Sequence, residues 1–181
     1  MTQQFTGVTA ASRFGLTQAK GISPMSTLPH EFGRFLRTAK TATYAAQGDQ
    51  ASVAPVLQDA KQLEYGEGRF LYRDIYFGML RFVGHEVVYS GGSAIWSMGY
   101  AGGLSPDVAP DSAQPIYAFL RKALLDPNEI IPIRGPSTLQ SDDMLYTCQV
   151  KGSLEWFHGS ETIAKNGLPL YELRFSGGCL A

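Results

Sequence analysis

Two glutamates, Glu86 and Glu161, have the spacing of residues on the apolar faces of β-strands. Alternate side chains of a strand share a face, so Glu86 is expected beside Val88. A carboxylate on such a face must be hydrogen-bonded, paired with a cation or protonated, because burying an unpaired charge is costly. One interpretation is that both glutamates line a pseudo-symmetric cavity and receive a cationic or hydrogen-bonding ligand. The alternative is that each binds a backbone bulge or an arginine such as Arg37 or Arg121.

Aromatic side chains accompany these carboxylates. Trp96 and Tyr100 fall on one strand face, and Tyr72, Asp74 and Tyr76 fall on a face of another strand. Aromatic rings beside a carboxylate can hold an organic cation, at about 0.5–2 kcal/mol for each well-placed ring. The alternative is that this aromatic stripe is simply core. Asp74 favours a polar site, since an acidic residue between two tyrosines is poorly suited to a dry core.

Asp74 and Glu86 also suggest acid–base catalysis, which uses two groups with divergent pKa values across a substrate. The second half of the chain carries Cys148 in the place of Asp74, so chemistry at Asp74 would be confined to one side. Arg134 either meets an anionic ligand group at a cavity mouth or anchors a loop. The spacing of the histidines predicts no metal site, and no nucleophile motif is present, so no catalytic residue is assigned. The candidate ligand-binding residues are Tyr72, Asp74, Tyr76, Glu86, Trp96, Tyr100, Arg134 and Glu161.

The composition of the chain excludes several classes of protein. A chain of 181 residues can bury its own core, and its net charge of -1 gives no reason to expect direct nucleic-acid binding or an anionic membrane as partner. Cys148 and Cys179 are expected to be free thiols, and no cofactor is expected. The chain has no apolar run of membrane-spanning length and no secretory signal, so a cytoplasmic location is expected. Whether the protein forms a homodimer stays open.

The residues that could do chemistry must be positioned by helices and strands. Apolar residues at helical spacing predict an amphipathic helix over about 29–47, which buries Phe32, Phe35, Leu36 and Ala39. A second one is predicted from 112 to the stop at Pro127, with Ile116, Phe119, Leu120 and Ala123 as its apolar positions. Residues 1–28 are expected to form a flexible arm, with a weak resemblance to an organelle-targeting segment as the alternative. Strands are predicted near 69–77, 80–90, 94–101, 144–151, 154–164 and 169–176, with tight turns at Ser90-Gly91-Gly92 and Asn166-Gly167.

The two blocks of strands match one another. With an offset of 75, positions 82–103 align with 157–178 and share six identities in 22, among them Glu86 with Glu161 and Gly84 with Gly159. The match predicts an α+β fold in which a helix followed by three antiparallel strands occurs twice. Six strands would form one curved antiparallel sheet or half-barrel covered by helices. Residues 29–181 are therefore expected to be a single domain of two repeats, about 29–104 and 111–181.

Several motifs resemble an uncharacterised bacterial domain that often follows an Xre-type helix-turn-helix in transcription regulators and also occurs alone. They are Tyr72-x-Asp74-x-Tyr76-x-Gly78, Phe82-x-Gly84-x-Glu86, Ile95-Trp96-x-Met98, Tyr100, Arg134-Gly135-Pro136, Tyr146-x-Cys148-x-Val150-x-Gly152, Glu155-Trp156-Phe157-x-Gly159-x-Glu161, Asn166-Gly167 and Gly177-Gly178. The resemblance covers about residues 32–180. It implies a bacterial origin and an effector-sensing role, without an established activity. Residues 1–28 are too short and too poor in basic side chains for the DNA-binding module.

The leading hypothesis is a small-molecule ligand-binding or sensor-like domain without catalysis, whose ligand is cationic or aromatic. The first alternative is a small hydrolase or isomerase that uses Asp74 and Glu86 as an acid–base pair. The second alternative is a protein-interaction or immunity-type module that uses an exposed sheet face or edge. A concave and covered carboxylate face would favour the first hypothesis, whereas a large apolar patch without a pocket would favour the last.

Overall fold

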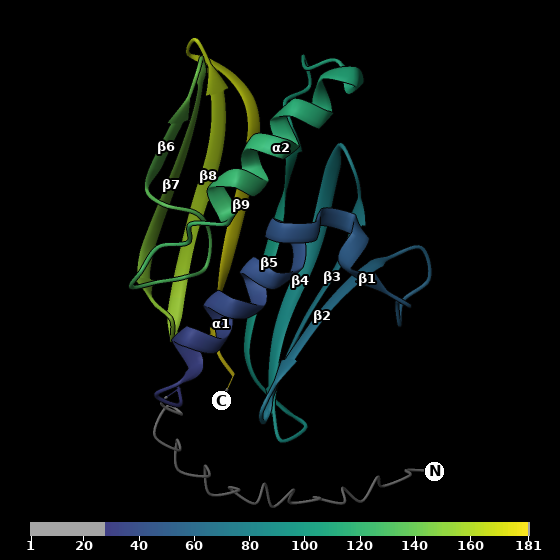
Figure 1. Ribbon diagram of the computed structural model, residues 1–181, viewed down its shortest axis with the longest axis vertical. Coiled ribbons are helices and arrows are strands. Elements are labelled where there is room, and N and C mark those ends of the chain that lie inside the picture. The colour runs from purple at the N-terminus through teal and green to yellow at the C-terminus, as the bar shows by residue number, and fades with distance from the viewer. Residues whose placement is uncertain (1–27, 181) are drawn as a thin grey trace, which may run out of the picture.

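The computed structural model describes residues 28–180, so the predicted N-terminal arm lies almost wholly outside the described residues. Those residues form one antiparallel sheet and a layer of helices (Figure 1). The helical segments are α1 (Phe32–Lys40), a π-helix (Thr41–Ala45), two 3₁₀-helices (Gly48–Ala51 and Pro110–Ser112) and α2 (Ala113–Leu124). The strands are β1 (Ser52–Val53), β2 (Lys61–Glu67), β3 (Phe70–Gly78), β4 (Arg81–Ser90), β5 (Ser93–Leu104), β6 (Thr138–Ser141), β7 (Met144–Ser153), β8 (Trp156–Lys165) and β9 (Leu168–Cys179).

The sheet consists of two meanders that meet at its centre. The strand order is β1-β2-β3-β4-β5-β9-β8-β7-β6, and each neighbouring pair is antiparallel. Strands β5 and β9 join the two meanders, with pairs running from Trp96–Cys179 to Leu104–Tyr171. The mixed helix and sheet class, and the single antiparallel sheet, are as the sequence predicts.

Three strands in the described part of the chain, β1, β2 and β6, are not predicted by the sequence pattern. Each meander therefore has more than the three expected strands. Strand β2 reads Lys-Gln-Leu-Glu-Tyr-Gly-Glu, in which only Leu63 and Tyr65 mark an apolar face, and β6 has only 4 residues. Periodicity is weak in such short and polar strands, and their pairing with a longer neighbour supplies the missing stabilisation. The predicted tight turns are correct, since Gly91, Gly92, Asn166 and Gly167 all have positive φ.

The predicted first helix, 29–47, is too long. Helix α1 ends at Lys40, and the chain continues as a π-helix in which Thr43 has non-helical angles of φ -97 and ψ -114. The hydroxyls of Thr41 and Thr43 donate hydrogen bonds to the carbonyls of Arg37 and Ala39, at 3.0 and 2.8 Å. Hydroxyls that donate hydrogen bonds to the preceding turn bend a helix, and a π-turn widens it. The two threonines therefore account for the end of α1 at Lys40.

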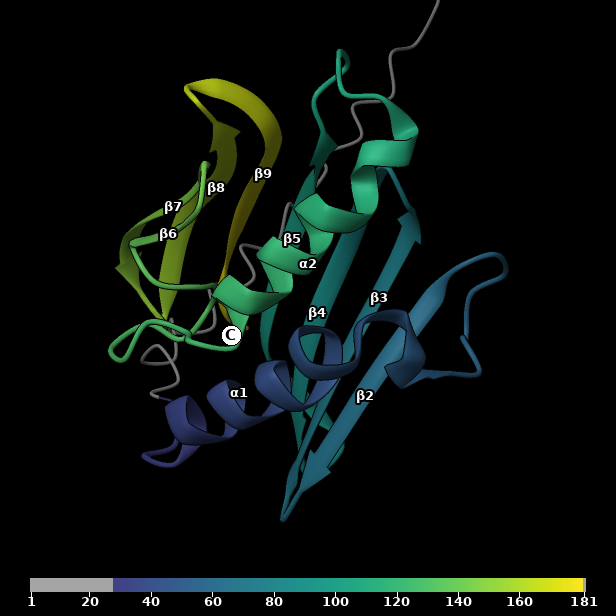
Figure 2. The same ribbon diagram turned by 45° about the horizontal axis from the view of Figure 1, so that its top comes forward.

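Both helices cover the same face of the sheet, and the strands at its two ends curve forward around them (Figures 1 and 2). As predicted, helix α1 buries Phe32, Phe35, Leu36 and Ala39, and α2 buries Ile116, Phe119, Leu120 and Ala123. The layer between helices and sheet is the hydrophobic core. Within residues 28–180 no helix is long and apolar enough to cross a membrane.

Candidate functional site

A cavity of about 160 Å³ lies between the helices and the first meander. Its walls come from the end of α1, the π-helix, α2, strands β3 to β5 and the loop before β6. The ionisable lining residues other than tyrosine are Lys40, Asp49, Asp74, Glu86, Arg121 and Arg134. The aromatic ones are Tyr44, Tyr72, Tyr76, Phe82, Tyr100 and Tyr117. Charged groups of both signs therefore converge on an aromatic-walled space.

The floor of the cavity is built by cross-strand neighbours. Asp74 on β3 pairs directly with Glu86 on β4, so their Cβ atoms lie within about 5.5 Å of each other. The Tyr100 hydroxyl on β5 donates a hydrogen bond to Asp74 Oδ1 at 2.7 Å. This bond depends on Gly84, because a Cβ at that position would overlap the Tyr100 ring. The two carboxyl groups that the sequence suggests as a pair are thus neighbours in the sheet.

Glu86 is neutralised by a lysine that the helix provides. The Lys40 ammonium donates a hydrogen bond to Glu86 Oε2 at 2.5 Å, and the two side chains are 10% and 2% exposed. The same ammonium lies 5.9 Å from the centre of the Tyr72 ring. Lys40 lies one helical turn after the buried Leu36 on the same side of α1, so its side chain extends toward the sheet.

Burial controls protonation in the cavity. Desolvation and the negative charge of Glu86 raise the pKa of Asp74 to about 7, against the opposing hydrogen bond from Tyr100. Desolvation also lowers the pKa of Lys40, although Glu86 works in the opposite direction. The pKa of Tyr72 is well above its usual value because the ring is buried next to Glu86 and Asp74. Asp74 therefore exchanges a proton near neutral pH.

The second meander holds its glutamate in a different way. Arg134 binds Glu161 with two N–H groups, and the hydroxyls of Tyr146 and Tyr171 donate to the same carboxylate at 2.7 and 2.9 Å. Burial opposes the charge, but these partners hold the pKa of Glu161 below its usual range. Glu161 is fully buried, and Cys148 is its cross-strand partner on β7. This site is a closed ion pair with its acceptor oxygens occupied.

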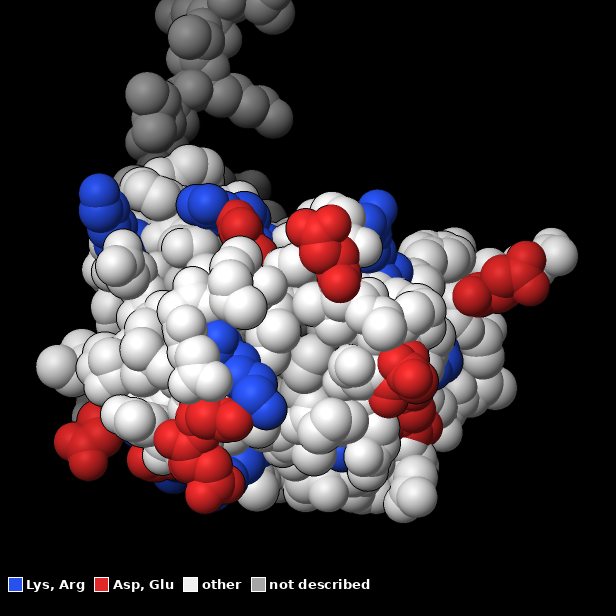
Figure 3. Space-filling view, turned by 90° about the horizontal axis from the view of Figure 1, so that it is seen from above, with Lys and Arg blue, Asp and Glu red and all other residues white. Residues whose placement is uncertain are grey.

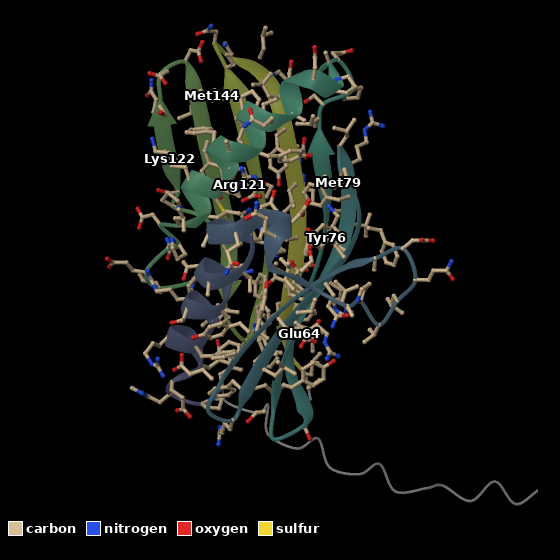
Figure 4. All side chains as sticks on the ribbon, turned by 45° about the vertical axis from the view of Figure 1, so that its right-hand side comes forward. Glu64, Tyr76, Met79, Arg121, Lys122 and Met144 are labelled. Atoms are coloured by element: carbon tan, nitrogen blue, oxygen red, sulfur yellow. The ribbon has the colours of Figure 1, made fainter. Side chains whose placement is uncertain are left out.

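One end of the cavity carries a second polar group of residues, which surrounds the short 3₁₀-helix Gly48–Ala51. Asp49 accepts a hydrogen bond from the Tyr76 hydroxyl and forms an ion pair with Lys61. Arg121 comes from α2 and lies over Gly48, with its Cδ 3.6 Å from the position of a Cβ there. Arg121, Tyr76 and Met79 all line the cavity and are labelled around the middle of the view in Figure 4.

The structure brings six of the eight candidate residues to the cavity wall: Tyr72, Asp74, Tyr76, Glu86, Tyr100 and Arg134. The other two lie outside it. Trp96 is fully buried in the core, where its ring stacks on Phe157 and its indole N–H donates to the Leu154 carbonyl at 2.9 Å. Glu161 lies behind Arg134. The expected arginine partners of the glutamates are also different, because Arg37 binds the carbonyls of Pro127 and Asn128 instead.

Sequence reasoning missed Lys40 and Asp49, and it considered Arg121 only as a partner of the glutamates. Lys40 falls on the polar side of the first helix together with Arg34 and Arg37, so its pattern is that of a solvated residue. The signal that could have found it is its spacing, since Lys40 follows Phe32 and Leu36 at intervals of four residues and so borders the apolar face of the helix. Asp49 and Arg121 carry no such signal.

The surface shows no continuous basic region on the face seen in Figure 3, where charged groups of both signs lie in separate clusters among uncharged residues. The fold and the cavity thus define a class: an α+β domain whose helices partly cover a polar and aromatic space over a single open sheet. The chain belongs to the family described as domain of unknown function (DUF5680), whose model matches residues 74–180. No curated protein and no solved structure matches the chain.

Proposed function

We propose that this protein binds a small organic molecule in the cavity between its helices and the first meander. The observation that carries the proposal is the convergence of Asp74, the Lys40–Glu86 pair and tyrosine side chains on one partly covered space of about 160 Å³. Enclosed pockets with mostly apolar walls and a few convergent polar groups are the usual form of ligand sites. The concave and partly covered shape of the site favours this function over an interaction module, which would use an open apolar face.

The size of the cavity and its charged groups limit the class of ligand that it can bind. Cavities of about 150 Å³ hold a molecule the size of benzene, whereas drug-sized ligands fill roughly 300–1,000 Å³. The ligand is therefore a metabolite-sized compound with an aromatic or short aliphatic body. Lys40 occupies the position beside Glu86 that a ligand cation would take, so the proposal favours a neutral or anionic ligand with acceptor oxygens over an organic cation.

The test is a thermal-shift screen of the full chain against a library of metabolite-sized compounds. A ligand at a hundred times its dissociation constant adds about 2.7 kcal/mol of stability, which corresponds to roughly 5–10 °C at this chain length. The variant Tyr72→Phe removes one cavity hydroxyl, and Tyr65→Phe is its matched control on the neighbouring strand, where the hydroxyl binds Glu67 instead. We expect the shift to shrink in Tyr72→Phe and to persist in Tyr65→Phe.

Equal shifts in both tyrosine variants would move the binding site away from the cavity. A screen in which no compound stabilises the protein would argue against small-molecule binding and favour a macromolecular partner. We further propose that the role is sensing in the cytoplasm without direct DNA contact, and this part rests on the resemblance to regulator-associated domains and on the balanced charge.

A second candidate function is acid–base catalysis by Asp74 and Glu86. The observation that favours it is the raised pKa of Asp74, about 7, next to a carboxylate that stays paired with Lys40. A general acid or base is most effective when its pKa lies near the working pH. Ligands found in the screen would be tested for turnover with Asp74→Asn as the comparison. Conversion that is unchanged in this variant excludes the pair from catalysis.

The two meanders also support a proposal about the origin of the fold. We propose that they descend from one duplicated unit. Asp74 and Glu86 face each other in the first meander as Cys148 and Glu161 do in the second, and Gly84 and Gly159 each leave room for an aromatic ring of the next strand. A ligand site in one half and a closed ion pair in the other would then be two outcomes of one ancestral arrangement.

A further inference from the structure

We propose that Lys40 captures small carbonyl compounds as an imine, with Glu86 and Asp74 as the groups that move the protons. The inference rests on the binding function proposed above and adds a covalent step to it. It identifies the ligand class as aldehydes or ketones of benzene-like size. The capture is reversible and releases only water.

Lys40 has the position that an imine-forming lysine needs. Among the described lysines it is the one that lines the cavity, and its side chain is 10% exposed. An ammonium has three N–H donors, and the hydrogen bond found for Lys40 is the one to Glu86. A ligand oxygen or carbonyl carbon can therefore approach the nitrogen from the cavity. Desolvation lowers the pKa of Lys40, which favours the neutral amine that attacks a carbonyl.

Two proton carriers line the same cavity as the attacking nitrogen. Glu86 is in hydrogen-bond contact with Lys40 and can accept its proton directly. Asp74 is the cross-strand neighbour of Glu86 and exchanges a proton near neutral pH, so a protonated Asp74 is available as a donor. The Tyr100 hydroxyl fixes the position of Asp74 at 2.7 Å.

The first half of the reaction forms the carbon–nitrogen bond. The Lys40 ammonium transfers a proton to the Glu86 carboxylate, and the amine lone pair then attacks the carbonyl carbon. As the C–N bond forms, the electron pair of the C=O π bond moves to oxygen, which takes a proton from Asp74. The nitrogen next returns a proton to Asp74. The product is a neutral carbinolamine beside two protonated carboxyl groups.

The second half removes water. The carbinolamine hydroxyl takes the proton from Glu86 and leaves as water, while the nitrogen lone pair forms the C=N bond. The iminium cation then lies against the Glu86 carboxylate, as the ammonium did before. Nothing is oxidised or reduced, and the charge of the site is the same at the end as at the start.

The experiment traps the imine by reduction in the wild-type full chain. The protein is incubated with benzaldehyde or with pyruvate in the presence of sodium cyanoborohydride, and peptide mass mapping measures the labelling rate at each lysine. Positioned acid–base groups contribute about 10²–10⁴ in rate, so we expect Lys40 to be labelled by one of the two probes about a hundredfold faster than the exposed Lys122 and Lys151. The surface lysines are controls within the same molecule, which makes the result independent of any variant's folding.

Two further measurements distinguish proton transfer by Asp74 from a Lys40 amine that is reactive by itself. The ratio of labelling at Lys40 to labelling at Lys122 should fall as the pH rises above about 7, because Asp74 loses the proton that it donates. Asp74→Asn should lower the same ratio, and Lys40→Arg should abolish the fast adduct while it keeps the positive charge beside Glu86.

Benzyl alcohol is the matched non-carbonyl probe, and its binding is read by thermal shift. Labelling of Lys40 no faster than that of Lys122 with both carbonyl probes overturns the imine. If benzyl alcohol nevertheless stabilises wild type, the binding function stands without it. If neither benzyl alcohol nor any compound of the screen stabilises the protein, the binding function falls as well. Fast Lys40 labelling that is unchanged in Asp74→Asn overturns the assigned role of Asp74.

Discussion

Folding raises the pKa of Asp74, and this shift makes the stability of the protein depend on pH. Its carboxyl is buried beside Glu86, and its pKa is about 7 in the folded protein against about 4 in an unfolded chain. The folded state therefore binds a proton between these two values that the unfolded state has already released. Stability contributed by this group is present at low pH and is lost as the pH rises towards 7.

The first prediction concerns this linkage. Raising the pH from about 5 to about 8 should lower the free energy of unfolding of the wild-type protein by about 3 kcal/mol through ionisation of Asp74. The free energy of unfolding of Asp74→Asn should not change with pH in this way. The measurement is urea unfolding of both proteins across this range. Parallel stability curves for the two proteins would show that Asp74 titrates at its ordinary value.

At the same scale, the sequence identified the buried carboxyl groups but not their partners. Glu86 and Glu161 could be placed on apolar faces by strand alternation, which is a local property. Lys40 and Arg134 reach them across 46 and 27 positions of the chain, and no local pattern contains that information. Without the partners, the two glutamates appeared equivalent, although one faces a cavity and the other is enclosed by Arg134 and two tyrosines.

At the scale of elements, glycines within strands decide where aromatic rings lie. Gly84 and Gly99 are both strand residues, but a Cβ at Gly84 would overlap the Tyr100 ring whereas one at Gly99 would meet nothing within 4 Å. Gly84 therefore lets the ring cross its strand and reach Asp74. Gly99 is exposed on the opposite face of the sheet.

The second prediction compares these two glycines. Gly84→Ala should destabilise the protein by about 1–3 kcal/mol, since overpacking forces the Tyr100 ring or the backbone to move. Gly99→Ala should be close to neutral, because added strand propensity meets open space. Thermal unfolding of both variants measures the difference. A Gly84→Ala variant as stable as Gly99→Ala would mean that the Tyr100 ring does not lie over this glycine.

Long strands with clear alternation were predictable, and the short or interrupted elements were not. The six strands near their predicted bounds are flanked by turn residues and have mostly apolar or aromatic residues on one alternating face. Strand β2 and strand β6 form on neighbours that provide their hydrogen bonds. The end of α1 at Lys40 was also missed, although its cause is local: the hydroxyls of Thr41 and Thr43 bond back to the preceding turn.

At the scale of the whole molecule, one strand pair holds the two meanders together. Strands β5 and β9 lie at the centre of the sheet, and both have paired neighbours on each side. Strands β1 and β6 lie at the edges and have 2 and 4 residues. The helices cross one face of this sheet, so the cavity depends on the arrangement of the meander and both helices together (Figure 2).

The third prediction follows from this arrangement. Hydrogen-bonded amides of β5 and β9 should exchange only through global unfolding, with free energies of opening near the full stability of roughly 5–15 kcal/mol. Amides of β1 and β6 should exchange through local fraying at far lower cost. Native-state hydrogen exchange read by NMR measures both. If amides of β5 and β9 open with a free energy as low as that of the edge strands, the two meanders separate as independent units.

The sequence by itself determined the α+β class, six of the strands, the apolar faces of both helices and the burial of Glu86 and Glu161. These follow from periodicity and turn residues, which are encoded within about ten neighbouring positions. Only the tertiary structure decided that Lys40 neutralises Glu86, that Arg134 closes the site at Glu161 and that Trp96 belongs to the core. Those outcomes depend on which distant side chain fills each buried position, because a buried charge takes its partner from whichever element packs against it.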